Sequence, residues 1–174
     1  MSAAPFPPTG IERRFGDDEI IVSKTDTTGR ITYANRVFQR VSGYAEAELL
    51  GQPHSIIRHP DMPRCVFKLL WDTIAAGSEV FAYVVNMAKG GDHYWVLAHV
   101  TPTFDAAGAI VGYHSSRRTA GRRAIEAVVP LYAALRAAEA APASRKDGLA
   151  AGAAALDEAL RARAVAYDEF VLSL

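Results

Sequence analysis

The sequence lacks the features that would attach it to a membrane, a nucleic acid or an oxidising compartment. Its 174 residues include one cysteine, Cys65, which excludes an internal disulfide and fits a reducing compartment. Nineteen basic residues balance nineteen acidic ones, so net charge gives no general attraction to nucleic acid or anionic lipid. No run approaches the roughly 20 apolar residues of a membrane span, and residues 1–10 have no signal-peptide pattern. We therefore expect a cytoplasmic protein.

The motifs of common enzymes are missing as well. There is no glycine-rich phosphate loop, and neither Ser115 nor Ser116 lies in a nucleophile-elbow motif. Cys65 and His59 form a conceivable pair, but no third group that could orient them is recognisable. His54 and His59 are five residues apart, which is not a standard zinc-ligand spacing. These patterns indicate a protein that is not an enzyme and has no metal site.

The order of the expected elements defines a fold class. Half of the residues are hydrophobic, which is enough for a core. Alternating apolar residues and turn signals predict strands at 19–26, 30–35, 79–87, 93–104 and 109–118. Helical spacing predicts helices at 36–42, 45–50 and 62–76, with residues 52–61 irregular. This order predicts an α+β fold, in which a five-stranded antiparallel sheet carries short helices on one face.

An abrupt rise in alanine content after residue 118 marks a separate region. Residues 119–139 and 149–172 read as two helices, and Pro130 should kink the first or reset its start. The apolar stripe on the second helix suits either a partner helix or a hairpin with the first. We therefore divide the chain into a leader (1–16), a central domain (17–118) and a C-terminal helical pair (119–174).

Strand alternation sorts the long strands into two faces. One face carries mostly small residues: Val80, Ala82, Val84, Asn86, Tyr94, Val96, Ala98 and Val100. Such a face leaves space beneath the helices for a planar ligand, unless Phe38, Leu70 and Trp71 fill it. The other face is aromatic, so we expect either a partner or the C-terminal helices to cover it.

Two segments concentrate polar side chains near this sheet. Residues 54–63 read His-Ser-Ile-Ile-Arg-His-Pro-Asp-Met-Pro, and residues 91–96 read Gly-Asp-His-Tyr-Trp-Val. The first holds two histidines, an arginine and an aspartate between prolines, and the second runs from a turn into an aromatic strand. Together they suggest a small sensory domain that holds a ligand.

An ordered series of motifs resembles a PAS domain. The motifs are Ile-Thr-Tyr-Ala-Asn at 31–35, Val-Ser-Gly-Tyr at 41–44, Glu-Leu-Leu-Gly-Gln-Pro-His at 48–54, Arg-His-Pro-Asp-Met-Pro at 58–63 and Gly-Gly-Asp-His-Tyr-Trp at 90–95. More narrowly, the chain is similar over about residues 17–135 to the PAS sensor of the bacterial aerotaxis receptor family. It looks most like the stand-alone PAS subunit of a bipartite energy-taxis system.

The resemblance implies a function and a set of site residues. It implies non-covalent binding of FAD and a redox or oxygen signal, passed to a chemotaxis-type receptor through the outer sheet face and the C-terminal helices, with a homodimer expected. Flavin-binding members often have a tryptophan where this chain has Val80. The cofactor-binding residues expected on this basis are Asn35, His54, Arg58, His59, Asp61, Trp71, Asn86 and Tyr94.

Other ligands stay open at this point. A haem-binding sensor would use His54 or His59 as its axial ligand. A PAS domain without cofactor would act as a dimerisation module, and another small molecule could fill the pocket instead.

Overall fold

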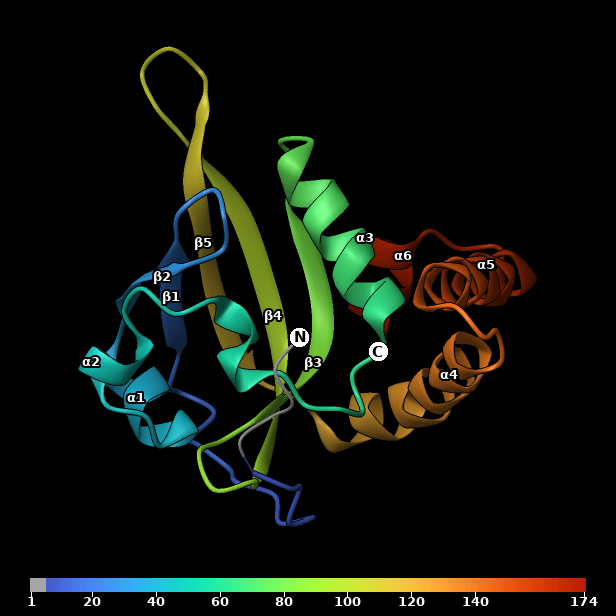
Figure 1. Ribbon diagram of the computed structural model, residues 1–174, viewed down its shortest axis with the longest axis horizontal. Coiled ribbons are helices and arrows are strands. Elements are labelled where there is room, and N and C mark those ends of the chain that lie inside the picture. The colour runs from blue at the N-terminus through green and yellow to red at the C-terminus, as the bar shows by residue number, and fades with distance from the viewer. Residues whose placement is uncertain (1–5) are drawn as a thin grey trace.

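A five-stranded sheet forms the centre of the fold in the computed structural model, which describes residues 6–174 (Figure 1). The strands are β1 Ile21–Thr25, β2 Ile31–Ala34, β3 Val80–Met87, β4 His93–Phe104 and β5 Ile110–Thr119. Their order across the sheet is β2-β1-β5-β4-β3, and every neighbouring pair is antiparallel. The predicted α+β fold with an antiparallel five-stranded sheet is confirmed, and each strand begins and ends within two residues of its expected position.

Short helices between β2 and β3 cover one face of the sheet (Figure 1). They are α1 Arg36–Ser42, α2 Glu46–Leu49, the 3-10 helix η1 His54–Ile57 and α3 Arg64–Ala75. The expectation that residues 52–61 are irregular is wrong for η1, because a turn of 3-10 helix forms directly after Pro53. Val66, Leu70 and Ile74 of α3 are buried against the sheet, whereas Leu69 and Thr73 are only partly buried.

The turn between β1 and β2 packs tightly against α3. The Asp26 carboxylate accepts hydrogen bonds from the backbone N–H groups of Thr28 and Arg30, both at 2.9 Å. Gly29 has a φ of 82°, and a Cβ added there would lie 2.8 Å from the Trp71 ring. Glycine is required here both by the left-handed backbone and by the close approach of the indole.

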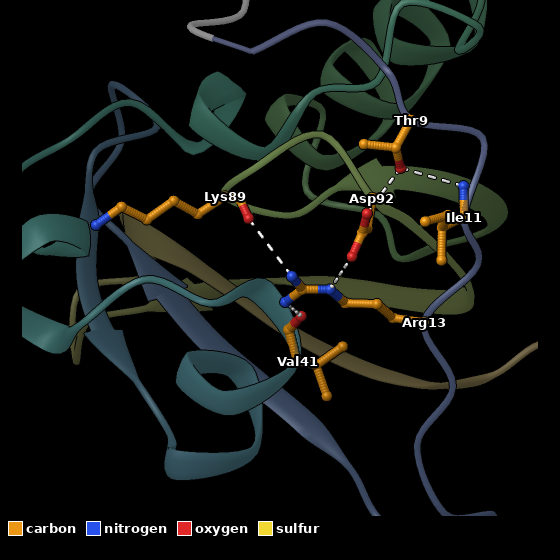
Figure 2. Close-up of polar contacts among 6 residues, drawn as sticks. All are labelled: Thr9, Ile11, Arg13, Val41, Lys89 and Asp92. Carbon is orange, nitrogen blue, oxygen red and sulfur yellow. Dashed lines mark hydrogen bonds and ion pairs between the residues drawn. The ribbon is translucent and has the colours of Figure 1, made fainter.

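The leader is tied to the β3–β4 hairpin and to the end of α1 by Arg13 (Figure 2). The guanidinium donates to the Asp92 carboxylate at 2.9 Å, to the Val41 carbonyl at 3.3 Å and to the Lys89 carbonyl at 3.5 Å. Thr9 donates to the other Asp92 oxygen at 2.7 Å. Residues 1–5 of the predicted leader lie outside the described residues. The rest of it is anchored to the sheet.

The C-terminal region contains three helices among the described residues, where the sequence predicted two. They are α4 Arg122–Ala140, α5 Arg145–Arg163 and α6 Tyr167–Leu172. The expected helix at 149–172 starts earlier and is broken at Ala164, which adopts a φ of 54° and donates its N–H to the last carbonyls of α5. α4 is continuous through Pro130, so of the two expected effects, a kink or a restart, the restart does not occur.

The C-terminal helices cover part of the outer sheet face within the same chain. Tyr83, Val85 and Met87 on this face of β3 are buried. The Tyr132 hydroxyl of α4 donates to the Tyr83 carbonyl at 2.6 Å, and its ring lies 6.2 Å from that of Trp95. The sequence left open whether a partner or the C-terminal helices cover this face, and in this structure the C-terminal helices do so. The division of the chain into three regions stays a prediction.

Candidate ligand-binding site

A cavity of about 750 Å³ lies between the sheet and α3. Its floor includes four residues that strand alternation placed inward, Val84, Asn86, Ala98 and Val100. Leu70, Trp71 and Ile74 of α3 form the opposite wall. Because the sheet residues are small, these helix side chains border the space without filling it. The sequence left open whether the space beneath the helices is free for a ligand or filled by side chains, and the structure shows that it is free. The volume falls within the range of about 300–1,000 Å³ that is usual for ligand pockets.

A buried arginine lies at the inner side of this cavity. Arg117 on β5 is 2% exposed, and its Nη2 donates to the Ser23 hydroxyl. Its Nε and Nη1 have no partner among residues 6–174, and the same holds for the Thr25 hydroxyl nearby on β1. Burial lowers the pKa of Arg117 to about 10, so it is a cation at neutral pH. Unsatisfied buried donors are costly, so a ligand that brings acceptor oxygens or negative charge is favoured here.

His54 extends this polar group as a neutral side chain. Its Nε2 lies 3.1 Å from the Ser23 hydroxyl, and its ring stacks on Phe38 at 6.0 Å. Burial and, to a smaller extent, the Arg117 charge lower the pKa of His54 to about 3. The imidazole therefore has one donor and one acceptor nitrogen at neutral pH, and the hydroxyl can bond either. The linked side chains of His54, Ser23 and Arg117 offer hydrogen bonds to one edge of a ligand.

The rim of the cavity is positively charged. Five cationic residues border it besides Arg117: Arg58, Arg64, Lys68, Arg145 and Lys146. Arg64 pairs with Glu139 and Lys68 with Asp72, so the excess positive charge comes from Arg58, Arg145 and Lys146. Within the part of the chain that the structure describes, no acidic residue lines the cavity. Arg58 lies over the Phe67 ring, with its Cζ 4.3 Å from the centroid. A surface of this kind attracts anions and suits phosphate groups, which arginine can bind through two hydrogen bonds.

Four of the residues expected to bind a cofactor line the cavity: His54, Arg58, Trp71 and Asn86. Trp71 meets Tyr113 edge to face, with 5.5 Å between the ring centroids. Asn86 is 4% exposed, and its backbone pairs with that of Arg58 in an isolated β-bridge. The structure brings these residues from η1, α3 and β3 to one space, and their contact with a cofactor stays a prediction.

Asn35 and Tyr94 do not line the cavity. The Asn35 amide accepts from the N–H groups of Val22 and Phe38 and donates to the Ile20 carbonyl. These bonds cap α1 and join it to β1, so the side chain has a structural role. Tyr94 is fully buried, and its hydroxyl has no partner within residues 6–174.

His59 and Asp61 do not line the cavity. Nδ1 of His59 accepts from the Asp61 N–H at 3.1 Å, and its ring lies 5.8 Å from that of His93. Asp61 forms an ion pair with Arg136 of α4 at 2.5 Å. The loop therefore divides: His54 and Arg58 reach the cavity, while His59 and Asp61 attach the loop to its surroundings. Of the two axial candidates for haem, only His54 borders the cavity.

Sequence reasoning missed the residues on the central strands. Ser23, Thr25 and Arg117 line the cavity, yet none of them lies in a recognisable motif. The usable signal is strand alternation on β5, which puts Arg117 on the same face as Tyr113 and Ser115. Within residues 6–174, no group of three histidine, cysteine or acidic side chains could hold a metal ion.

The family follows from the sequence comparison. Residues 31–117 match the family model described as the PAS fold. The chain belongs to the PAS family. Over 137 residues this PAS protein is 44% identical to the aerotaxis receptor of Escherichia coli strain K12, a match that covers 79% of the chain and 27% of the receptor. It is 30% identical over 99 residues to the nitrogen fixation regulatory protein of Klebsiella pneumoniae, covering 57% of the chain and 20% of that protein.

A solved structure supports the same fold. The light-state structure of the blue-light photoreceptor Aureochrome1 LOV superposes with a TM-score of 0.57 at 25% identity, over 64% of this chain and 89% of the other. The PAS chain spans about a quarter of the aerotaxis receptor that it matches. No helix within residues 6–174 is long and apolar enough to cross a membrane. The chain is thus a PAS sensor domain related to a receptor.

Proposed function

We propose that this PAS domain binds FAD in its cavity and reports redox or oxygen state to a chemotaxis-type signalling partner. The observation that carries the proposal is Arg117, a buried cation with two unpartnered nitrogens in an otherwise largely apolar cavity. A flavin ring offers carbonyl and ring-nitrogen acceptors that such a group can bind. The similarity to the aerotaxis receptor supports the sensory role, and the resemblance to the PAS sensors of that family implies FAD as the ligand.

The remaining residues fit the two parts of this cofactor. The apolar walls, formed by Trp71 and Leu70 on one side and by Ala98 and Val100 on the other, would enclose the planar ring. The basic rim would bind the pyrophosphate, for which the absence of acidic residues among the described lining is favourable. Bound FAD would supply a redox centre whose charge and hydrogen bonding change on reduction.

The chain's own residues provide a route for the signal. Asn86 and His54 border the cavity, and either can exchange a donor for an acceptor by turning its side chain or moving a proton. Asn86 lies on β3, and α6 packs against this strand. We propose that a changed hydrogen bond at Asn86 alters β3, and through it the outer sheet face and the C-terminal helices that would contact a partner or a second copy.

An absorbance spectrum of the purified protein, taken before and after addition of dithionite, tests the ligand. The proposal predicts two flavin bands that bleach on reduction, and release of FAD when the protein is unfolded. An intense Soret band would instead indicate haem, with His54 as its ligand. A colourless protein that cannot be reconstituted with FAD would also contradict the proposal.

A further inference from the structure

Helix α5 of the C-terminal region contributes to the wall of the cavity. Arg145, Lys146 and Leu149, all in its first two turns, border the same space as the sheet residues. Within residues 6–174, the Arg145 and Lys146 side chains form no ion pair or hydrogen bond, so both cations are available to a ligand. Arg117, 2% exposed with unpartnered Nε and Nη1, independently indicates that this cavity receives an acceptor-rich molecule.

Two glycines allow α5 to lie close enough to reach the cavity. A Cβ at Gly148 would be 2.2 Å from the Glu139 carbonyl oxygen, and one at Gly152 would be 2.5 Å from Glu139 Cγ. Glycine inside a helix costs about 1 kcal/mol relative to alanine. Gly148 and Gly152 both lie against Glu139. The close packing of α4 and α5 that they allow therefore contributes more to the stability of the fold than the helix propensity lost at the two glycines.

Arg64 and Glu139 connect this contact to α3. The Glu139 carboxylate, 8% exposed, accepts from the Cys65 N–H at 2.7 Å and from Arg64 Nε at 3.0 Å. Arg64 also donates to the Arg145 carbonyl at 3.1 Å. Burial alone would raise the pKa of Glu139, but these hydrogen bonds outweigh it and the pKa is lowered. Arg64, which itself borders the cavity, therefore holds the start of α5 next to the cavity.

We propose that the α4–α5 hairpin is a ligand-binding lid, in which Arg145 and Lys146 bind the phosphate groups of the ligand. The inference rests on the proposed function, since it takes the ligand to be the flavin dinucleotide. Because the binding residues belong to the hairpin, ligand binding and hairpin docking stabilise each other to the same extent. The C-terminal helices then respond to occupancy of the cavity as part of the site.

Affinity measurements on the full chain test the assignment of the phosphate contacts. FAD and riboflavin, which lacks phosphate, are titrated into apoprotein by flavin fluorescence. Arg145→Gln/Lys146→Gln should weaken FAD binding at least tenfold and change riboflavin binding less than twofold. The matched control, Arg123→Gln/Arg161→Gln, removes two exposed cations elsewhere on the same hairpin and should change neither. Equal FAD affinity in the Arg145→Gln/Lys146→Gln variant and the wild type would overturn the inference.

Limited trypsin digestion tests the coupling directly. Cleavage after Arg145 and Lys146 should be slowed at least threefold by FAD, relative to cleavage after Arg161 near the far end of α5. Cleavage rates that are the same with and without bound FAD would overturn the lid. If the wild type binds FAD, but the double variant binds it equally well and FAD does not slow cleavage, the lid alone is refuted. If the wild type binds no flavin, the proposed function is refuted as well.

Discussion

The guanidinium of Arg117 lies over the ring of Phe38, with 4.7 Å between its Cζ and the ring centroid. This contact partly offsets the cost of burying the charge, since a cation over an aromatic face contributes about 0.5–2 kcal/mol. It satisfies neither Nε nor Nη1, which stay without partners among the described residues. The buried Arg117 charge is therefore expected to favour ligand binding and to destabilise the ligand-free fold.

Replacing Arg117 should change ligand affinity and folding stability in opposite directions. In Arg117→Met, the free energy of unfolding of the ligand-free protein should be unchanged or higher by about 1 kcal/mol, because an unpaired buried charge is lost. FAD affinity should fall at least tenfold, since charged hydrogen bonds contribute about 1.5–3 kcal/mol each. Urea unfolding and flavin titration measure the two quantities. A variant that is less stable but binds FAD as the wild type does would contradict the role given to Arg117.

The close approach of Trp71 to Gly29 predicts an unequal cost for two glycine substitutions. Gly29 and Gly108 both have φ near 80°, but a Cβ at Gly108 meets no atom within 4 Å. Gly108→Ala should cost about 1 kcal/mol from backbone strain, and Gly29→Ala should cost a further 1–3 kcal/mol or so from the collision with the indole. Equal losses in urea unfolding would show that Trp71 does not pack over the turn.

The lowered pKa of His54, a partly buried side chain, predicts a dependence of stability on pH. Its pKa is about 3 in the folded protein, against about 6.5 in an unfolded chain. Between these values only the unfolded state binds the proton, so stability is complete above pH 6.5 and falls as the pH drops. The wild type should lose between about 1 and 2 kcal/mol from this group between pH 7.5 and 5.

The His54→Gln variant isolates this contribution, because His59 and His114 also have pKa values lowered by burial and remain in both proteins. Urea unfolding at the two pH values should give a smaller loss for the variant. Equal losses would mean that folding does not lower the pKa of His54.

Arg13 should contribute more to stability than its neighbour Arg14. Arg13 joins the leader to Asp92 and to the carbonyls of Val41 and Lys89, whereas Arg14 is mostly exposed and lies 3.9 Å from Glu12. Arg13→Gln should lower the free energy of unfolding by about 1–3 kcal/mol, because a charged hydrogen-bonding group loses several partners. Arg14→Gln should change it by less than about 0.5 kcal/mol. A larger loss of unfolding free energy for Arg14→Gln than for Arg13→Gln would show that Arg13 does not anchor the leader.

Local patterns were sufficient to predict the sheet and the floor of the cavity. Alternation on β3 and β4 assigned Val84, Asn86, Ala98 and Val100 to the inner face, because side-chain direction in a strand follows from position alone. The turn at Gly29 could likewise be predicted from its residue types.

The polar part of the site depends on contacts that local patterns do not determine. An arginine on a strand is usually exposed, so Arg117 gave no signal by residue type. The separation of His54 and Arg58 from His59 and Asp61 depends on how η1 turns the chain. The reach of Arg145 to the cavity depends on how α5 docks, for which Gly148 and Gly152 are the only local sign.

Filling the cavity tests the central claim most directly. Ala98 lies on its floor, whereas the adjacent Leu97 points to the outer face and is partly buried. The measurement is the flavin content of purified Ala98→Phe, with Leu97→Phe as the control on the same strand. The account predicts that Ala98→Phe is folded and carries little or no FAD, while Leu97→Phe keeps the wild-type content. Full FAD content in folded Ala98→Phe would show that the flavin does not bind beneath the sheet.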